Sequence, residues 1–156
     1  MKAFALFSVL ALLLPMPSFS ATQISSTNPA GLVSYLKAKG YRAELVIDKS
    51  GEPLIHSSTG GTEFTIVFYN CTKGKDCTTI QFFSWFKEDK FSVSKANEWN
   101  KQWRFASLYL DDDANTCLQM DLNLDKGGMS EELFGDNLLL WEDALGRAEK
   151  FVFDND

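Results

Sequence analysis

The sequence predicts an α+β domain with an antiparallel sheet, in the order helix, four strands, helix, two strands, helix. Several short segments alternate apolar and polar residues and end at Gly, Asn or Asp turns, which is typical of antiparallel strands. Other segments carry apolar residues at helical spacing. The chain has 156 residues, 45% of them hydrophobic, which is enough for one domain with a core and too few for two.

Capping residues indicate where the helices begin and end. A first helix is expected to begin after Asn28, which can cap it, and to end at Gly40. A second is expected over residues 94–103, where apolar residues recur at helical spacing. The third begins after Ser130 and keeps that spacing as far as Val152. The strands are expected over residues 41–48, 53–58, 62–71, 77–86, 105–110 and 116–124.

Residues 1–20 predict a signal peptide. A lysine precedes an apolar run over residues 4–14, which prolines and small residues follow. The run is shorter than the roughly 20 residues that span a bilayer, so cleavage after Ser20 or Ala21 fits better than an anchor. We therefore expect residues 21–156 to form one domain with no membrane span, located in the periplasm or secreted.

Cys71 and Cys77 close the tip of the clearest hairpin. In an exported chain we expect a disulfide, and a reactive thiol pair is less favoured because the spacing is not C-x-x-C. So small a ring contributes roughly 2 to 3 kcal/mol in the loop-entropy account. Cys117 is left over, and we expect a half-buried thiol or, as the alternative, a bridge between two chains. With the hairpin cysteines opposite each other, the expected pairs are Phe68 with Ile80, Ile66 with Phe82, and Phe64 with Ser84.

Both faces of this hairpin are apolar. A sheet with one solvated face would alternate apolar and polar residues, so a second layer or a partner must cover the outer face. We expect a second copy of the chain or an extended protein segment there. The outer face consists of Val67, Tyr69, Phe83 and Trp85.

Composition and charge exclude several functions. The net charge of −6 and the lack of a basic stripe exclude nucleic acid as a partner. One histidine, His56, and three cysteines are too few for most His- or Cys-rich metal sites, and we expect no metal and no cofactor. Asp111, Asp113 and Asn115 copy the first positions of a calcium loop, but Leu122 stands where the loop needs Glu. No nucleophile elbow or phosphate loop occurs, so no catalytic residue is assigned.

Residues 97–105 form the segment richest in side chains that can recognise a ligand. One interpretation is a helix that packs two tryptophans on the core and keeps its asparagines at the surface. The other is a binding edge, and a pocket there would suit a small-ligand sensor or an enzyme. The candidate residues are Asn97, Trp99, Asn100, Trp103 and Arg104.

The chain contains the stretches GYRAELVIDKSGEP, TIVFYNC, CTTIQFF, ANEWNKQWRFASLYLDDD and CLQMDLNL, and most specifically N-x-W-N followed by R-F at residues 97–105. Together they resemble the YbjN family of bacterial sensory transduction regulators, over roughly residues 28–153. The resemblance implies a fold similar to type III secretion chaperones, which are commonly dimers that hold extended protein segments. It implies no catalytic residue. We therefore expect a non-enzymatic, exported protein-binding module, chaperone-like or regulatory in the cell envelope.

Overall fold

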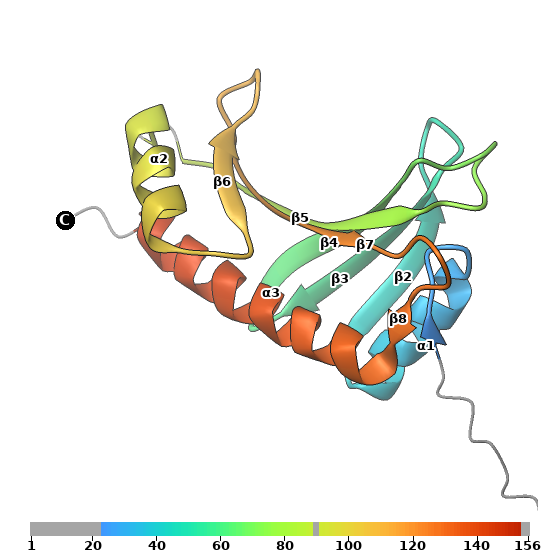
Figure 1. Ribbon diagram of the computed structural model, residues 1–156. Coiled ribbons are helices and arrows are strands. Elements are labelled where there is room, and N and C mark those ends of the chain that lie inside the picture. The colour runs from blue at the N-terminus through green and yellow to red at the C-terminus, as the bar shows by residue number, and fades with distance from the viewer. Residues whose placement is uncertain (1–22, 89–90, 154–156) are drawn as a thin grey trace, which may run out of the picture.

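The computed structural model describes residues 23–88 and 91–153, so the expected signal peptide lies outside the described residues (Figure 1). The chain forms helices and antiparallel strands in the predicted order. Two short strands were not predicted: β1, which precedes α1, and β8, which precedes α3. They pair with each other. The elements are β1 (Gln23–Ile24), α1 (Pro29–Ala38), β2 (Arg42–Ile47), β3 (Pro53–Thr59), β4 (Thr62–Tyr69), β5 (Thr79–Phe86), α2 (Val93–Gln102), β6 (Ser107–Leu110), β7 (Thr116–Asn123), β8 (Met129–Ser130) and α3 (Glu131–Phe153).

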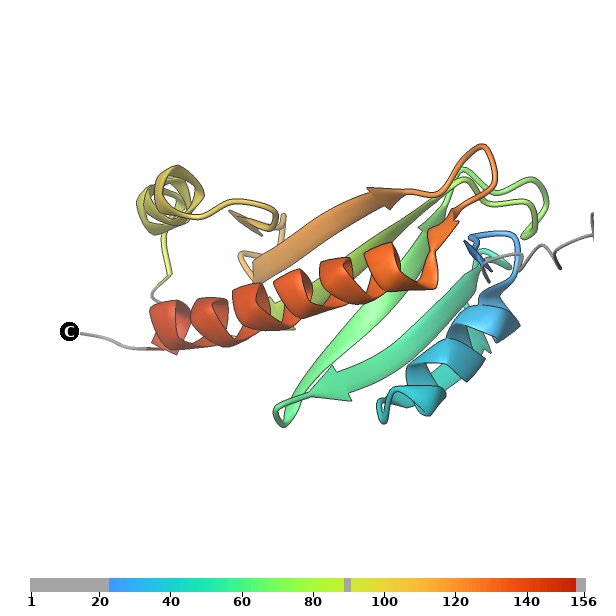
Figure 2. The ribbon, with the colours of Figure 1, turned by 60° about the horizontal axis from the view of Figure 1, so that its bottom comes forward.

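The main sheet has six antiparallel strands in the order β2-β3-β4-β5-β7-β6. Helices α1 and α3 lie on the same face of this sheet, and α2 lies at its β6 end (Figures 1 and 2). The predicted α+β class is therefore confirmed. The sheet order has one crossover, because β7 lies between β5 and β6.

The central hairpin of β4 and β5 has the predicted register. Cys71 and Cys77 form a disulfide, and Phe68 stands opposite Ile80. The pairing of β4 with β5 ends at Thr65 and Phe83, so the third expected pair, Phe64 with Ser84, lies one residue beyond it. A short ring at the hairpin tip therefore fixes the register along the strands that follow, because a slip by one residue would turn every side chain to the other face.

The core lies between the sheet and α3. Trp141 on α3 is fully buried, and its ring stacks on Phe82 of β5 with centroids 5.6 Å apart and 17° between the planes. Phe64 and Phe134 pack around them with centroids 5.9 to 6.1 Å apart. Burying each of these side chains contributes about 1.5 to 3 kcal/mol, so the aromatic cluster holds the helix against the sheet despite two glycines within the helix.

Helix α1 joins the core beside the start of α3. Its N-cap is Asn28, as predicted, and the Asn28 side chain accepts a hydrogen bond from the Gly31 N–H. The hydroxyl of Tyr35 donates to the backbone oxygen of Glu131 at 3.1 Å. A Cβ at Gly135 would lie 2.9 Å from this hydroxyl, so the helical glycine makes room for Tyr35.

Residues 105–110 were expected to form a strand, and the structure shortens it. Strand β6 begins only at Ser107, because Phe105 has a φ of 75°, in the left-handed region that an extended strand cannot use. Within residues 23–88 and 91–153, no helix is both long and apolar enough to cross a bilayer.

Candidate functional site

One face of the main sheet carries no helix among the described residues, because α1 and α3 both lie on the other face (Figure 1). The alternation of side chains along each strand assigns residues to this uncovered side, which we call the open face. Cross-strand pairs place the same residues in rows; one row runs from Glu44 through His56, Thr65 and Phe83 to Gln119. The open face includes Arg42, Glu44, Val46, Leu54, His56, Glu63, Thr65, Val67, Tyr69, Gln81, Phe83, Trp85, Tyr109, Cys117, Gln119 and Asp121.

Large aromatic side chains of the open face reach solvent. Trp85 is 58% exposed, Tyr69 42% and Tyr109 37%. Phe83 and Val67 are half-buried. The structure thus places all the predicted outer-face residues on one side of β4 and β5. Tyr109 joins them because β7 pairs with β5 on one side and with β6 on the other, so that Cys117 stands opposite both Trp85 and Tyr109.

A polar row crosses the open face at one end of the strands. The Tyr69 hydroxyl donates to Oε1 of Gln81 at 3.3 Å. Nε2 of Gln81 donates to Oε1 of Gln119 at 3.3 Å and to Oδ1 of Asp121 at 2.9 Å. Side-chain hydrogen bonds in this row therefore link β4, β5 and β7 across the open face.

A hollow of about 680 Å³ lies in the open face over β2 to β5. Arg42 and Glu63 form an exposed ion pair at 3.5 Å, and Glu44 adds a second carboxylate. Nδ1 of His56 lies 3.5 Å from the Thr65 hydroxyl. The charged residues of the hollow are therefore one cation and two carboxylates, which favours a cationic group in any occupant. Phe83 and Trp85 form its apolar wall.

Cys117 is a free thiol buried on the open face between Trp85 and Tyr109. It is more deeply buried than the half-buried thiol that we expected. Burial, then the nearby Asp111 carboxylate, raises the pKa of the Cys117 thiol. Burial and Cys117 raise the pKa of Tyr109 to about 12. Both groups are therefore neutral at physiological pH, and a protonated thiol is a poor nucleophile.

The segment 97–105 was expected to recognise a ligand or to pack as a helix, and its two central residues serve the fold. Trp99 is 1% exposed and packs on Phe151 with ring centroids 5.5 Å apart. The Asn100 side chain pairs with the backbone of Leu108 in β6: its amide donates to the Leu108 oxygen at 2.9 Å, and its oxygen accepts from the Leu108 N–H at 3.0 Å. The Trp99 ring is therefore buried, and the Asn100 amide is engaged by β6 although the residue itself is exposed.

The rest of this segment lies nearer the surface. Trp103 is half-buried, with the Arg147 guanidinium 4.3 Å above its ring. Asn97 and Arg104 are exposed, and the Arg104 guanidinium lies 5.5 Å from the centre of the exposed Phe105 ring. The hollow of the open face has none of these residues in its lining, so the structure does not bring the two sets of candidate residues together.

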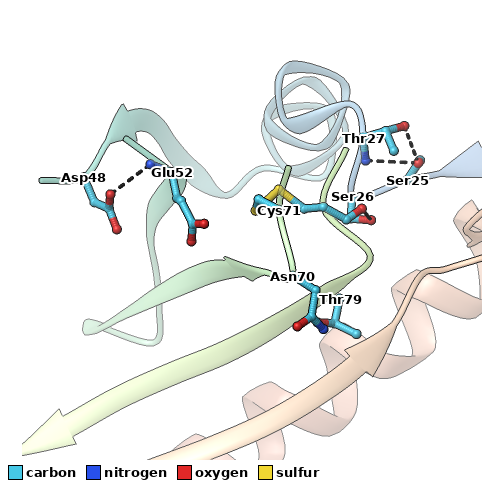
Figure 3. Close-up of a disulfide and its surroundings, with 9 residues drawn as sticks. Ser25, Ser26, Thr27, Asp48, Glu52, Asn70, Cys71 and Thr79 are labelled. Carbon is cyan, nitrogen blue, oxygen red and sulfur yellow. Dashed lines mark hydrogen bonds between the residues drawn. A yellow bond between two sulfur atoms is a disulfide. The ribbon is translucent and has the colours of Figure 1, made fainter. Parts of the chain in front are cut away.

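The disulfide lies at the end of the sheet next to the N-terminal segment (Figure 3). The Ser26 hydroxyl donates to the backbone oxygen of Cys77, and Nδ2 of Asn70 donates to the Thr79 hydroxyl at 3.3 Å. Cys77 is 1% exposed. The bridge therefore anchors a loop to the body of the domain. Among the described residues, no group of three or more His, Cys, Asp or Glu side chains could hold a metal ion.

Comparison with known proteins decides the family. The sequence pattern of the YbjN family, described as "Putative bacterial sensory transduction regulator", matches residues 28–153. The chain belongs to the YbjN family. This family is one of regulators and is not a known enzyme family. No curated protein and no solved structure matches the chain, so the likeness to type III secretion chaperones stays a prediction.

Sequence reasoning missed several residues of the site. Arg42, Glu44 and His56 line the hollow because β2 and β3 extend the face that β4 and β5 begin. The sequence shows that these residues alternate with apolar ones, but it does not show which strands lie next to each other in the sheet. Tyr109 was missed for the same reason, since β6 reaches the face only through the crossover.

Proposed function

We propose that this YbjN protein is a non-enzymatic, exported module that binds an extended segment of a partner protein on its open face. The main support is the exposure of Trp85, Tyr69 and Tyr109 on the open face, over which no helix lies in the described part of the chain. Exposed aromatic side chains gathered on one face are typical of protein-binding surfaces. A regulatory role for the family is consistent with action through protein contact.

The chemistry of the face favours a particular kind of segment. Phe83 and Trp85 offer apolar contacts, while Glu44 and Glu63 outnumber Arg42 in the hollow beside them. The whole chain is also acidic, with a net charge of −6. A segment with apolar side chains and interspersed lysine or arginine would complement both features. We therefore propose a basic, apolar and extended partner segment.

The proposed compartment is the periplasm or the extracellular space. Two observations support it: the signal-peptide pattern of residues 1–20, and the disulfide between Cys71 and Cys77. Disulfides persist in oxidising compartments and are rare in the cytosol of most organisms. Mass spectrometry of the protein from a periplasmic extract, with and without reductant, would report both the processed terminus and the bridge. An unprocessed chain with free thiols in the cytosol would contradict this location.

The binding proposal is tested with peptides of defined charge. A fluorescent peptide that alternates leucine and lysine should bind the wild type, and one that alternates leucine and glutamate should bind about tenfold more weakly or not at all. Trp85→Ala should weaken binding of the basic peptide about tenfold, as loss of an aromatic anchor does. The matched control is Leu133→Ala, which removes a side chain that is 51% exposed on α3.

The outcomes separate clearly in fluorescence anisotropy titrations. Unchanged affinity in Trp85→Ala, or an equal loss in Leu133→Ala, would contradict binding at the open face. Equal binding of the acidic and basic peptides would contradict the charge preference. The alternative of a small-ligand site near residues 97–105 gains no support from Trp99, which is buried, or from Asn100, whose amide is bonded to the backbone of Leu108.

A further inference from the structure

The two edges of the main sheet differ in their free backbone groups. At the β6 edge, the Asn100 side chain takes both the N–H and the oxygen of Leu108, so it occupies the place of a neighbouring strand. At the opposite edge, β3 is the one strand that pairs with β2 within residues 23–88 and 91–153. An edge strand without such a cap can accept another strand. The β2 edge is therefore the one to examine.

The register shows which residues of β2 carry free groups. The Asp48 N–H donates to the Glu52 oxygen at 2.9 Å, just beyond the last β2–β3 pair. In an antiparallel ladder, hydrogen-bonded positions alternate, so the backbone groups of every second residue point away from the neighbour. For β2 these residues are Ala43, Leu45 and Ile47. Within the described part of the chain, no hydrogen bond engages their backbone groups.

Apolar side chains lie exposed at the same edge. Leu45 is 38% exposed and Ile47 is 63% exposed, on the face of the sheet that α1 covers only in part. Ala43, on the same side, is buried. The free backbone groups and the exposed apolar side chains therefore belong to the same short stretch of strand.

We propose that a second copy of this chain pairs antiparallel with β2, with Leu45 of the two copies opposite each other on a two-fold axis. Ala43 of each copy then stands opposite Ile47 of the other. This register engages all three residues with free backbone groups and covers Leu45 and Ile47. It also places Arg42 opposite Asp48 in both halves, so charges of opposite sign meet twice. The strand is thus complementary to itself.

Shifting this pairing of the two β2 strands to a neighbouring register is less favourable. Centring the pair on Glu44 would place Glu44 opposite itself and Ile47 opposite Tyr41, whose N–H already donates to the Leu36 oxygen at 3.0 Å. Centring it on Val46 would place Glu44 opposite Asp48, again two like charges. Centring it on Ala43 would leave Ile47 beyond the pair. Like charges directly opposite each other destabilise a sheet, so the Leu45-centred register is selected.

A two-fold axis perpendicular to the sheet keeps both open faces on one side of the joined sheet. Arg42 and Glu44 belong to β2 and line the hollow of the open face, so the hollows of the two copies would lie on either side of the axis. Pairing at β2 does not depend on what the open face binds. A negative result in the peptide experiment would therefore not contradict pairing at β2. A monomeric protein would likewise not contradict peptide binding at the open face.

The register is tested by cross-linking in a Cys117→Ser background, which removes the free thiol. Leu45→Cys should form a disulfide-linked dimer under mild oxidation, because opposite strand residues have Cα atoms about 4.5 to 5.5 Å apart. Ile47→Cys is the matched control. Its two copies would lie four residues apart along the strands, roughly 13 Å, which no disulfide spans. Equal cross-linking of both variants, or none in Leu45→Cys, would overturn the proposed register.

Association itself is measured by sedimentation of the full processed protein. The wild type should be a dimer, and Leu45→Lys alone or Leu45→Glu alone should weaken dimerisation at least about tenfold, because each places like charges on the axis. A mixture of the two variants should restore it. Leu133→Lys on α3 should leave the dimer intact. A monomeric wild type, or no restoration in the mixture, would overturn the proposal.

Discussion

The amide of Asn100 offers the sharpest test of how this fold is held together. It makes two hydrogen bonds to the backbone of Leu108, a residue whose side chain is 1% exposed in β6. Each such bond contributes about 1 kcal/mol net, and more if its partner is left buried without water. We expect Asn100→Ala to lower the free energy of unfolding by about 2 kcal/mol relative to a matched control.

The control is Asn97→Ala, at an exposed position of the same helix. Both changes replace Asn by Ala in a helix, so the gain in helix propensity cancels when they are compared. Urea unfolding, followed by tryptophan fluorescence with the disulfide intact, gives both free energies. If Asn100→Ala falls within about 0.5 kcal/mol of Asn97→Ala, the amide is not holding β6 in place and the reasoning is refuted.

Further predictions concern glycine, the disulfide and pH. Gly146→Ala should raise the unfolding free energy by about 1 kcal/mol, because nothing lies within 4 Å of the new Cβ, whereas Gly135→Ala should gain less or lose stability; urea unfolding compares the pair. Replacing Cys71 and Cys77 together by alanine should lower the free energy of unfolding by about 2 kcal/mol. Reductant should lower that of the wild type by the same amount and leave that of the double variant unchanged. The pKa of Tyr109 is raised to about 12, so its phenol ionises at lower pH in the unfolded chain than in the folded one. Its contribution to the free energy of unfolding should therefore fall as the pH rises from about 10 to about 12. Comparing the tyrosinate absorbance of Tyr109→Phe with that of the wild type checks this titration.

The elements predicted best are those that depend on chain neighbours. Asn28 caps α1, the hairpin tip carries the disulfide, and Phe68 faces Ile80. Each follows from residues close together in the sequence, where spacing and backbone geometry leave few choices. The start of β6 was misplaced because the left-handed conformation of Phe105 has no signal in the side-chain pattern.

The candidate site divides in the same way. The apolar outer side of β4 and β5 could be read from alternation, and the structure places Phe83 and Trp85 on the open face. The sequence could not show which residues of segment 97–105 are structural. A tryptophan and an asparagine at these positions give the same pattern whether they contact a ligand or pack within the domain. Only the position of Leu108 beside Asn100 separates the two interpretations.

By itself, therefore, the sequence determined the types of the elements, the register of one hairpin and the family to which the chain belongs. The tertiary structure decided the strand order and, among residues 23–88 and 91–153, which face of the sheet carries no helix and which edge strand carries no cap. The physical reason is that local structure depends on a few adjacent residues, while burial of one face depends on surfaces distant in the chain. Asn100 could be recognised as a cap for β6 only once α2 lay beside that strand.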